Sequence, residues 1–447
     1  MTRRSVLRGA IAAVAVIGVV VLVVIGWMVF QPGATAFAGG HPVDLADYHG
    51  VSPVGVPAEL AQADIVTRGE YVTRMADCEA CHTVKGGTPF AGGRAFKLPF
   101  GTLYTPNITP DRETGIGAWS DADFIRAVHK GVAKDGTKLY PAFPYASYTA
   151  LTDQDVLAIK AYLFSLKAVH SPARPNTFGF PYNQRWLMGI WSLLFNGDTR
   201  FRPVTERTQE WNRGAYLVDA AGHCGECHTP RNLMQAMNTR EKFAGGAAEG
   251  WTAYNITGDR LTGVGAWSPE ELTAYLAKGH ALGHGTASGP MAEVVNLSTS
   301  HLAPSDLAAI VTYLKTIPAI HTASLPDMLA GPAPVAPKAG ITDSAPGKRS
   351  FEGACASCHA WNGAGALLAE AQLTGSRAIN DPSAVNVAQM ILSGTGTQKG
   401  GRPYMPGFAA AYSDQEIADV ANYVTARFGA KASRIDAKGV ATLRAQN

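Results

Sequence analysis

All six cysteines of this 447-residue chain lie in three C-x-x-C-H pentads. The cysteines are Cys78 and Cys81, Cys224 and Cys227, and Cys355 and Cys358, and the histidines that complete the pentads are His82, His228 and His359. In a helical turn, positions i, i+3 and i+4 share one face. Two thiols there can reach the two vinyl groups of a haem while the imidazole reaches its iron, and the pentad is the signature of c-type haem attachment. The sequence therefore predicts three covalently bound haems c.

Two other uses of cysteine pairs fit less well. Structural zinc needs four ligands per site and gives no reason for a histidine to follow every second cysteine. A thioredoxin-like redox pair belongs to a βαβ context, which the sequence does not suggest. No cysteine is left over for a structural disulfide.

Methionine opposite histidine makes haem iron six-coordinate and raises its potential. In the third unit the candidate is Met405, within Tyr-Met-Pro-Gly-Phe, while Met390 lies in an apolar helical pattern typical of core. In the second unit the candidate is Met291, within Gly-Pro-Met-Ala. Met234 and Met237 follow the second pentad too closely and are interpreted as packing residues.

The first unit departs from this pattern. Phe143 stands at the same distance from Trp119 as Met291 does from Trp267, and phenylalanine has no lone pair for iron. We expect the first haem to be five-coordinate or to take an unusual ligand, of which His129 is the leading candidate. The competing interpretation of His129 is a histidine on a helix surface. Either way, the first haem should differ spectroscopically from the other two.

An internal repeat defines the organisation of the chain. Phe-Ala-Gly-Gly, Asn-Ile-Thr and Thr-Gly-x-Gly-Ala-Trp-Ser occur in the same order after the first and the second pentad. Asn107 and Asn255, in these landmarks, are candidates for binding haem propionates or for forming turns. Ser/Thr-x-x-Asp/Glu sequences predict helix starts at Ser120, Ser268 and Ser413, and also at Thr152.

The predicted fold class is all-α, with three haem domains in tandem behind one N-terminal membrane helix. The predicted boundaries are 1–35 for the anchor or signal peptide, 58–172 for domain 1, 173–205 for an apolar connector, 206–322 for domain 2, 323–345 for a Pro/Ala linker and 346–430 for domain 3. The connector contains an apolar run, residues 186–195, that is too short to span a membrane. It is either a helix packing two domains together or a surface for a partner subunit or the membrane.

Residues 10–30 are uncharged and long enough to cross a bilayer core. Arg3, Arg4 and Arg8 precede this run, and no Lys or Arg follows until Arg68. The positive-inside rule then keeps the N-terminus in the cytoplasm and exports the remainder. A cleaved signal peptide is the alternative, with Ala34-Thr35-Ala36 as the cleavage pattern.

Composition excludes other classes of function. The excess of 38 Lys+Arg over 35 Asp+Glu is only +3, which is too weak for nucleic-acid binding. No nucleophile elbow, Walker loop or dinucleotide glycine fingerprint is present, so no catalytic residue is predicted.

With these motifs the sequence resembles the triheme cytochrome c subunits of membrane-bound bacterial dehydrogenases that oxidise alcohols, gluconate, sorbitol, fructose or aldehydes. The resemblance covers about 58–430. Besides the pentads, it rests on four stretches: residues 101–109 (GTLYTPNIT), 139–145 (LYPAFPY), 210–217 (EWNRGAYL) and 227–232 (CHTPRN).

The resemblance implies a non-catalytic electron-transfer subunit at the periplasmic side of the bacterial inner membrane. It would take electrons from a dehydrogenase catalytic subunit, with or without a small subunit, and pass them to membrane ubiquinone. Two alternatives are a free-standing carrier to a terminal oxidase and a haem peroxidase that uses a five-coordinate first haem. Peroxide turnover by the isolated chain would favour the latter.

Overall fold

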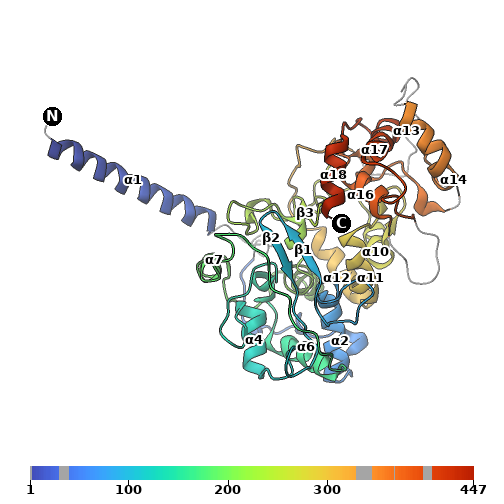
Figure 1. Ribbon diagram of the computed structural model, residues 1–447. Coiled ribbons are helices and arrows are strands. Elements are labelled where there is room, and N and C mark those ends of the chain that lie inside the picture. The colour runs from blue at the N-terminus through green and yellow to red at the C-terminus, as the bar shows by residue number, and fades with distance from the viewer. Residues whose placement is uncertain (1–2, 30–39, 329–344, 367, 396–404, 447) are drawn as a thin grey trace.

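The computed structural model describes residues 3–29, 40–328, 345–366, 368–395 and 405–446. Figure 1 shows a long helix, α1 (Arg3–Val29), projecting from a body built mainly of helices. The helical class is as predicted, but three short antiparallel hairpins were not foreseen: β1 (Ala95–Leu98) with β2 (Gly101–Tyr104), β3 (Gly246–Ala248) with β4 (Trp251–Ala253), and β5 (His280–Ala281) with β6 (Gly285–Thr286).

The helix α1 covers the segment predicted to be a membrane anchor. Its described large apolar side chains, from Ile11 to Val24, are exposed. Among the described residues, no helix combines the length and the apolarity needed to cross a bilayer. The anchor therefore stays a prediction.

The first and second units use the same helices in the same order. The first contains α2 (Ile65–Met75), α3 (Cys78–His82), α4 (Asp121–Lys130), α5 (Tyr145–Tyr148) and α6 (Asp153–Ser165). The second contains α8 (Gln209–Tyr216), a π-helical turn (Leu217–Ala221), α9 (Gly225–His228), α10 (Pro269–Lys278), α11 (Pro290–Leu297) and α12 (Pro304–Leu314). Between them lies α7 (Leu187–Phe195).

A glycine sets the central helix crossing in each copy. The helix α2 packs against α6, and α8 packs against α12. A Cβ atom at Gly69 would collide with the carbonyl oxygen of Ala158, and one at Gly214 would collide with that of Ala309. The Arg-Gly dipeptides of the repeat therefore allow the two helix backbones to approach closely.

The predicted helix starts are present. Ser120, Ser268 and Ser413 each form a complete capping box with the acidic residue three positions later. Thr152 caps α6 through the backbone of Asp155, but the carboxylate of Asp155 does not return to the cap. It binds Arg68 instead, with a shortest distance of 2.6 Å.

The first and second units share one hydrophobic core rather than packing as two separate cores. Across it, Tyr216 of the second unit donates to Asp155 Oδ2 of the first at 2.6 Å, and Tyr71 of the first donates to Asp306 Oδ2 of the second at 2.6 Å. Arg213 holds Asp306 at 2.7 Å as Arg68 holds Asp155. Each aspartate thus accepts from an arginine of its own unit and a tyrosine of the other, which is the pattern of a two-fold interface.

The third unit has a core of its own. Its helices are α13 (Ala345–Ser350), a π-helical turn (Phe351–Cys355), α14 (Ala356–His359), α15 (Arg377–Asn380), α16 (Val385–Ser393), α17 (Asp414–Phe428) and α18 (Ala437–Gln446). The helix α18 buries Val440 and Leu443 in this core, beyond residue 430, the predicted end of the domain. The predicted linker lies largely at residues 329–344, outside the described part of the chain.

Candidate haem-binding sites

Each pentad forms about one helical turn that follows a longer helix. The turns are α3 in the first unit, Cys224 with α9 in the second, and Cys355 with α14 in the third. All six cysteines are free thiols. Cys78 and Cys224 both pack against the core shared by the first two units, whereas Cys355 packs against the core of the third.

The three pentad histidines make the same second contact. Nδ1 lies 2.8 Å from the carbonyl oxygen of Pro106 for His82, 2.6 Å from that of Tyr254 for His228, and 2.6 Å from that of Ala371 for His359. A carbonyl oxygen only accepts, so Nδ1 must be the donor in all three cases. Nε2 then carries the lone pair, which is the arrangement that orients a metal-binding imidazole. Burial lowers the pKa of each ring and favours the neutral form.

The repeated Asn-Ile-Thr landmark explains how two of these carbonyls are positioned. Pro106 and Tyr254 directly precede Asn107 and Asn255. Each asparagine is buried, accepts from the threonine two residues later, and donates its amide to protein oxygens, including the carbonyls of Val169 and Ile320. The asparagines therefore build the turn behind the histidine, and their role in binding propionates is not supported.

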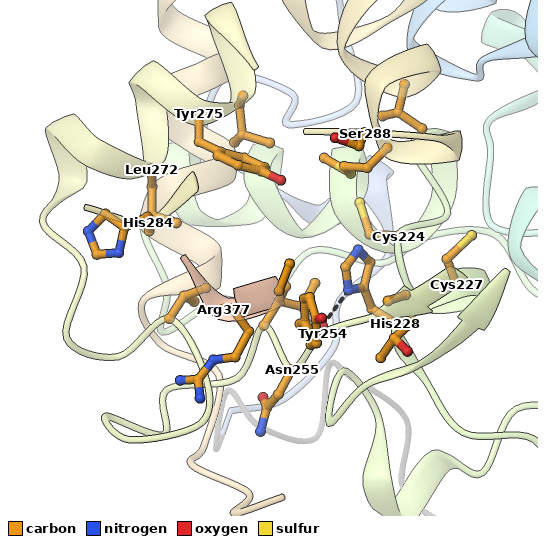
Figure 2. Close-up of a pocket in the computed structure, with 18 of the residues that line it drawn as sticks. Cys224, Cys227, His228, Tyr254, Asn255, Leu272, Tyr275, His284, Ser288 and Arg377 are labelled. Carbon is orange, nitrogen blue, oxygen red and sulfur yellow. Dashed lines mark hydrogen bonds between the residues drawn. The ribbon is translucent and has the colours of Figure 1, made fainter. Parts of the chain in front are cut away.

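A cavity of about 260 Å³ lies beside the second pentad. Figure 2 shows Cys224, Cys227 and His228 on one wall, with Leu272 and Tyr275 of α10 across from them. The predicted ligand Met291 lines the same cavity, as does Trp251. His284 also lines it, with its ring stacked 3.7 Å from Trp267 of the repeated Gly-Ala-Trp motif.

Residues of all three units line this cavity. Met75 comes from the first unit, and Arg377, Asn386 and Met390 come from the third. Met390 is therefore not only a core residue, as the sequence indicated, because it also faces the second site. Asn386 fixes the third unit here: its amide accepts from Thr252 N at 2.8 Å and donates to Thr252 O at 2.9 Å.

The second site fits a haem c. It offers two thiols and a free Nε2 beside a largely apolar space, and Arg377 is the one lysine or arginine among its lining residues. Zinc fits poorly, because burial raises the pKa of Cys224 and of Cys78 to about 12, whereas zinc binds thiolates. Within the described residues, no group of three or more His, Cys, Asp and Glu side chains is placed to hold a metal ion.

The first site contains Phe143 where the repeat has Met291. Its ring packs edge to face on Tyr148 at 5.5 Å, and Tyr148 donates to the carbonyl of Ala76, just before the first pentad. Tyr148 also contacts His223, which precedes Cys224, with the rings 5.3 Å apart. Neither residue was predicted from the sequence, because neither belongs to a motif, and His223 stands where the first copy has Asp77.

His129 does not lie on the helix surface. It is fully buried, its Nδ1 lies 3.6 Å from Asp153, and neither ring nitrogen has a hydrogen-bond partner. Burial lowers its pKa to about 4. The equivalent residue of α10 is Ala277, which is not among the residues lining the second cavity, whereas Tyr275 and Leu276 are. By the repeat, His129 faces away from the first haem site.

In the third unit, Met405 packs against the same core as Cys355. Its backbone exchanges two hydrogen bonds of 3.1 Å with Thr395. The structure thus places this predicted ligand and the third pentad around one core.

Arg94 joins the first site to the second, which the sequence did not reveal. Its guanidinium donates to the carbonyl of Ala80, inside the first pentad, at 2.5 Å. It also pairs with Glu293 at 2.7 Å and Glu249 at 3.0 Å. Glu293 follows Met291 by two residues, so this one side chain bridges two predicted haem neighbourhoods.

Comparison with known proteins identifies cytochrome c relatives of this chain. The cytochrome c family matches residues 66–167 and 344–427. The chain is 39% identical over 405 residues to the gluconate 2-dehydrogenase cytochrome c subunit of Pantoea cypripedii, covering 86% of this chain and 91% of that one. It is 34% identical over 406 residues to the cytochrome c subunit of the quinone alcohol dehydrogenase of Gluconacetobacter polyoxogenes, covering 86% and 85%.

A third relative is much longer than this chain. A nicotinate dehydrogenase subunit of Pseudomonas putida is 42% identical over 387 residues, which is 85% of this chain but 31% of that protein.

Proposed function

The chain belongs to the family of cytochrome c subunits of membrane-bound dehydrogenases, and we propose that it carries three haems c and transfers electrons from a dehydrogenase catalytic subunit to membrane ubiquinone. The observation that carries the proposal is the threefold geometry of the pentads, each with a partly buried histidine whose Nδ1 is bound to a carbonyl. The names of the relatives support a dehydrogenase as the partner.

The chain's own residues have distinct roles in this proposal. A bound haem c supplies reversible one-electron chemistry at iron. The cysteine pairs would hold it through thioethers, and His82, His228 and His359 would each offer a ring nitrogen to the iron. Met291 and Met405 would offer a sulfur at the second and third sites, whereas Phe143 has no lone pair to offer at the first.

Arg377 is the lining residue that suits the haem propionates at the second site. It is held by the carbonyls of Leu261 at 2.5 Å and Pro326 at 3.1 Å, which fix the guanidinium while leaving donors free.

The location is part of the proposal. Residues 10–30 would cross the bacterial inner membrane, with Arg3, Arg4 and Arg8 in the cytoplasm and the pentads in the periplasm, where haem c is attached.

Affinity purification of the full chain from detergent-solubilised membranes tests the proposal. We expect three haems per chain by intact mass and pyridine haemochrome absorbance, together with a co-purified dehydrogenase subunit that reduces a soluble ubiquinone analogue when its substrate is added. Cys227→Ser should reduce the count of normally attached haems by one and provides the matched control. Two haems in the wild-type chain would overturn the triheme assignment, and quinone reduction that survives removal of this chain would overturn its role.

A further inference from the structure

We propose that the outer face of α7 lies on the surface of a phospholipid bilayer, as a second membrane contact beside the anchor. This inference rests on the proposed function, because it assumes that the body of the chain is held close to the membrane. It concerns residues 180–195 and the neighbouring loop at 233–234.

The helix α7 has two different faces. Trp191 is buried, with its ring 5.8 Å from Tyr145 of the first unit and its Nε1 donating to Met234 O of the second at 2.8 Å. This inner face packs the two units together. Trp186, Ile190 and Leu193 follow at i, i+4 and i+7 on the other face, and they are 65%, 47% and 83% exposed.

The exposed apolar surface continues beyond the helix. Phe180 precedes α7 and is 82% exposed. Leu233 is 97% exposed, and the bond from Trp191 to Met234 O holds its loop against α7. Clusters of large exposed apolar side chains mark interaction surfaces rather than ordinary solvent-facing surface.

The charge of this segment favours lipid over a protein partner. Between Phe180 and Gly197, Arg185 is the one charged residue, and no carboxylate is present. Arg185 donates to the carbonyl of Lys138 at 2.8 Å, which places a second basic residue close by. Tryptophan with aliphatic side chains on one face, next to basic residues, is the pattern of a helix lying in the interface of an anionic membrane.

The path of the chain agrees with this placement. The body resumes after α1 at residues 40–44, where Val43 N donates to Pro203 O at 3.0 Å and Asp44 pairs with Arg202 at 3.1 Å. These partners follow soon after α7 ends at Phe195. In Figure 1, α7 lies at the edge of the body on the side from which α1 projects.

Photolabelling of the full-length holoprotein tests the proposal. The protein is reconstituted in vesicles of phosphatidylethanolamine and phosphatidylglycerol that carry a diazirine on the acyl chain, and labelled peptides are mapped by mass spectrometry. We expect label on peptides covering 180–195 and 233–234 and none on α17. Trp186→Gln/Ile190→Gln/Leu193→Gln should reduce label on 233–234 severalfold, whereas Trp361→Gln, an exposed tryptophan of the third unit, should not. Thermal unfolding and haem absorbance of each variant verify folding.

The outcomes separate the two proposals. Label on α1 but not on 180–195 overturns the surface contact and leaves the anchor intact. Label on 180–195 without label on α1 supports the contact and overturns the anchor. Label on 180–195 that disappears when the dehydrogenase partner is bound identifies a protein-docking surface and overturns the membrane assignment.

Discussion

Replacing Tyr216 by phenylalanine should destabilise the first two units together. The hydroxyl of Tyr216 donates to Asp155 Oδ2 at 2.6 Å, while Arg68 occupies Oδ1. The side chain of Asp155 is 1% exposed, so Oδ2 would lose its partner without gaining water. A hydrogen bond to a buried charged group contributes about 1.5–3 kcal/mol, and the loss of its donor falls in the upper part of that range. At roughly 2–4 °C per kcal/mol for a unit of this size, the unfolding midpoint should fall by roughly 4–12 °C.

Thermal unfolding of the holoprotein, followed by far-ultraviolet circular dichroism and by haem absorbance, measures this shift. Tyr71→Phe should give a shift of similar size, because Tyr71 makes the matching bond to Asp306. Tyr182→Phe is the control, since that side chain is about half exposed. If Tyr216→Phe shifts the midpoint no more than Tyr182→Phe, the exchanged bonds do not hold the two units together and the reasoning is refuted.

Two further substitutions test the first site. Phe143→Met should convert the first haem from high-spin to low-spin, seen as loss of the high-spin signal in electron paramagnetic resonance; three low-spin haems in the wild type would contradict this. Desolvation in the folded chain raises the pKa of the partly buried Asp77 from 3.8 to about 8, so the folded chain keeps a proton that the unfolded chain releases. Wild type should therefore lose stability relative to Asp77→Asn as the pH rises from about 4 to about 8; parallel melting curves across that range would exclude the shift.

The haem-binding pentads and the helix starts could be predicted because each is specified by residues that lie close together in sequence. A pentad occupies one turn, and a serine three residues before a carboxylate specifies a helix start without reference to the remaining fold. The capping boxes at Ser120 and Ser268 formed as expected. At Thr152 the capping box is incomplete, because the carboxylate of Asp155 binds Arg68 and Tyr216, which lie far from it in sequence.

What the sequence could not reveal depends on contacts between distant segments. His129 has the pattern of a surface residue, yet it is buried because Asp153 and the chain around Asn196 cover it, with Asn196 donating to its carbonyl at 2.8 Å. The carbonyl partner of each pentad histidine could not be predicted either, because every residue type supplies a backbone carbonyl oxygen. The repeated Asn-Ile-Thr was the available signal at two of the three histidines, and of its two interpretations the structure supports the turn.

The approach to the second pentad shows how the second copy contacts the first unit. The second copy has one more residue before its pentad than the first, and the π-helical turn at Leu217–Ala221 absorbs such an extra residue without breaking the helix. His223 adopts a left-handed conformation with φ of 38°, as its counterpart Asp77 does with φ of 51°, and its ring contacts Tyr148 of the first unit. Met75 reaches the second cavity from the same side, and Arg377 and Met390 of the third unit reach it from another. Both other units therefore help to build the second site, and a haem held there would lie beside residues of the first and of the third.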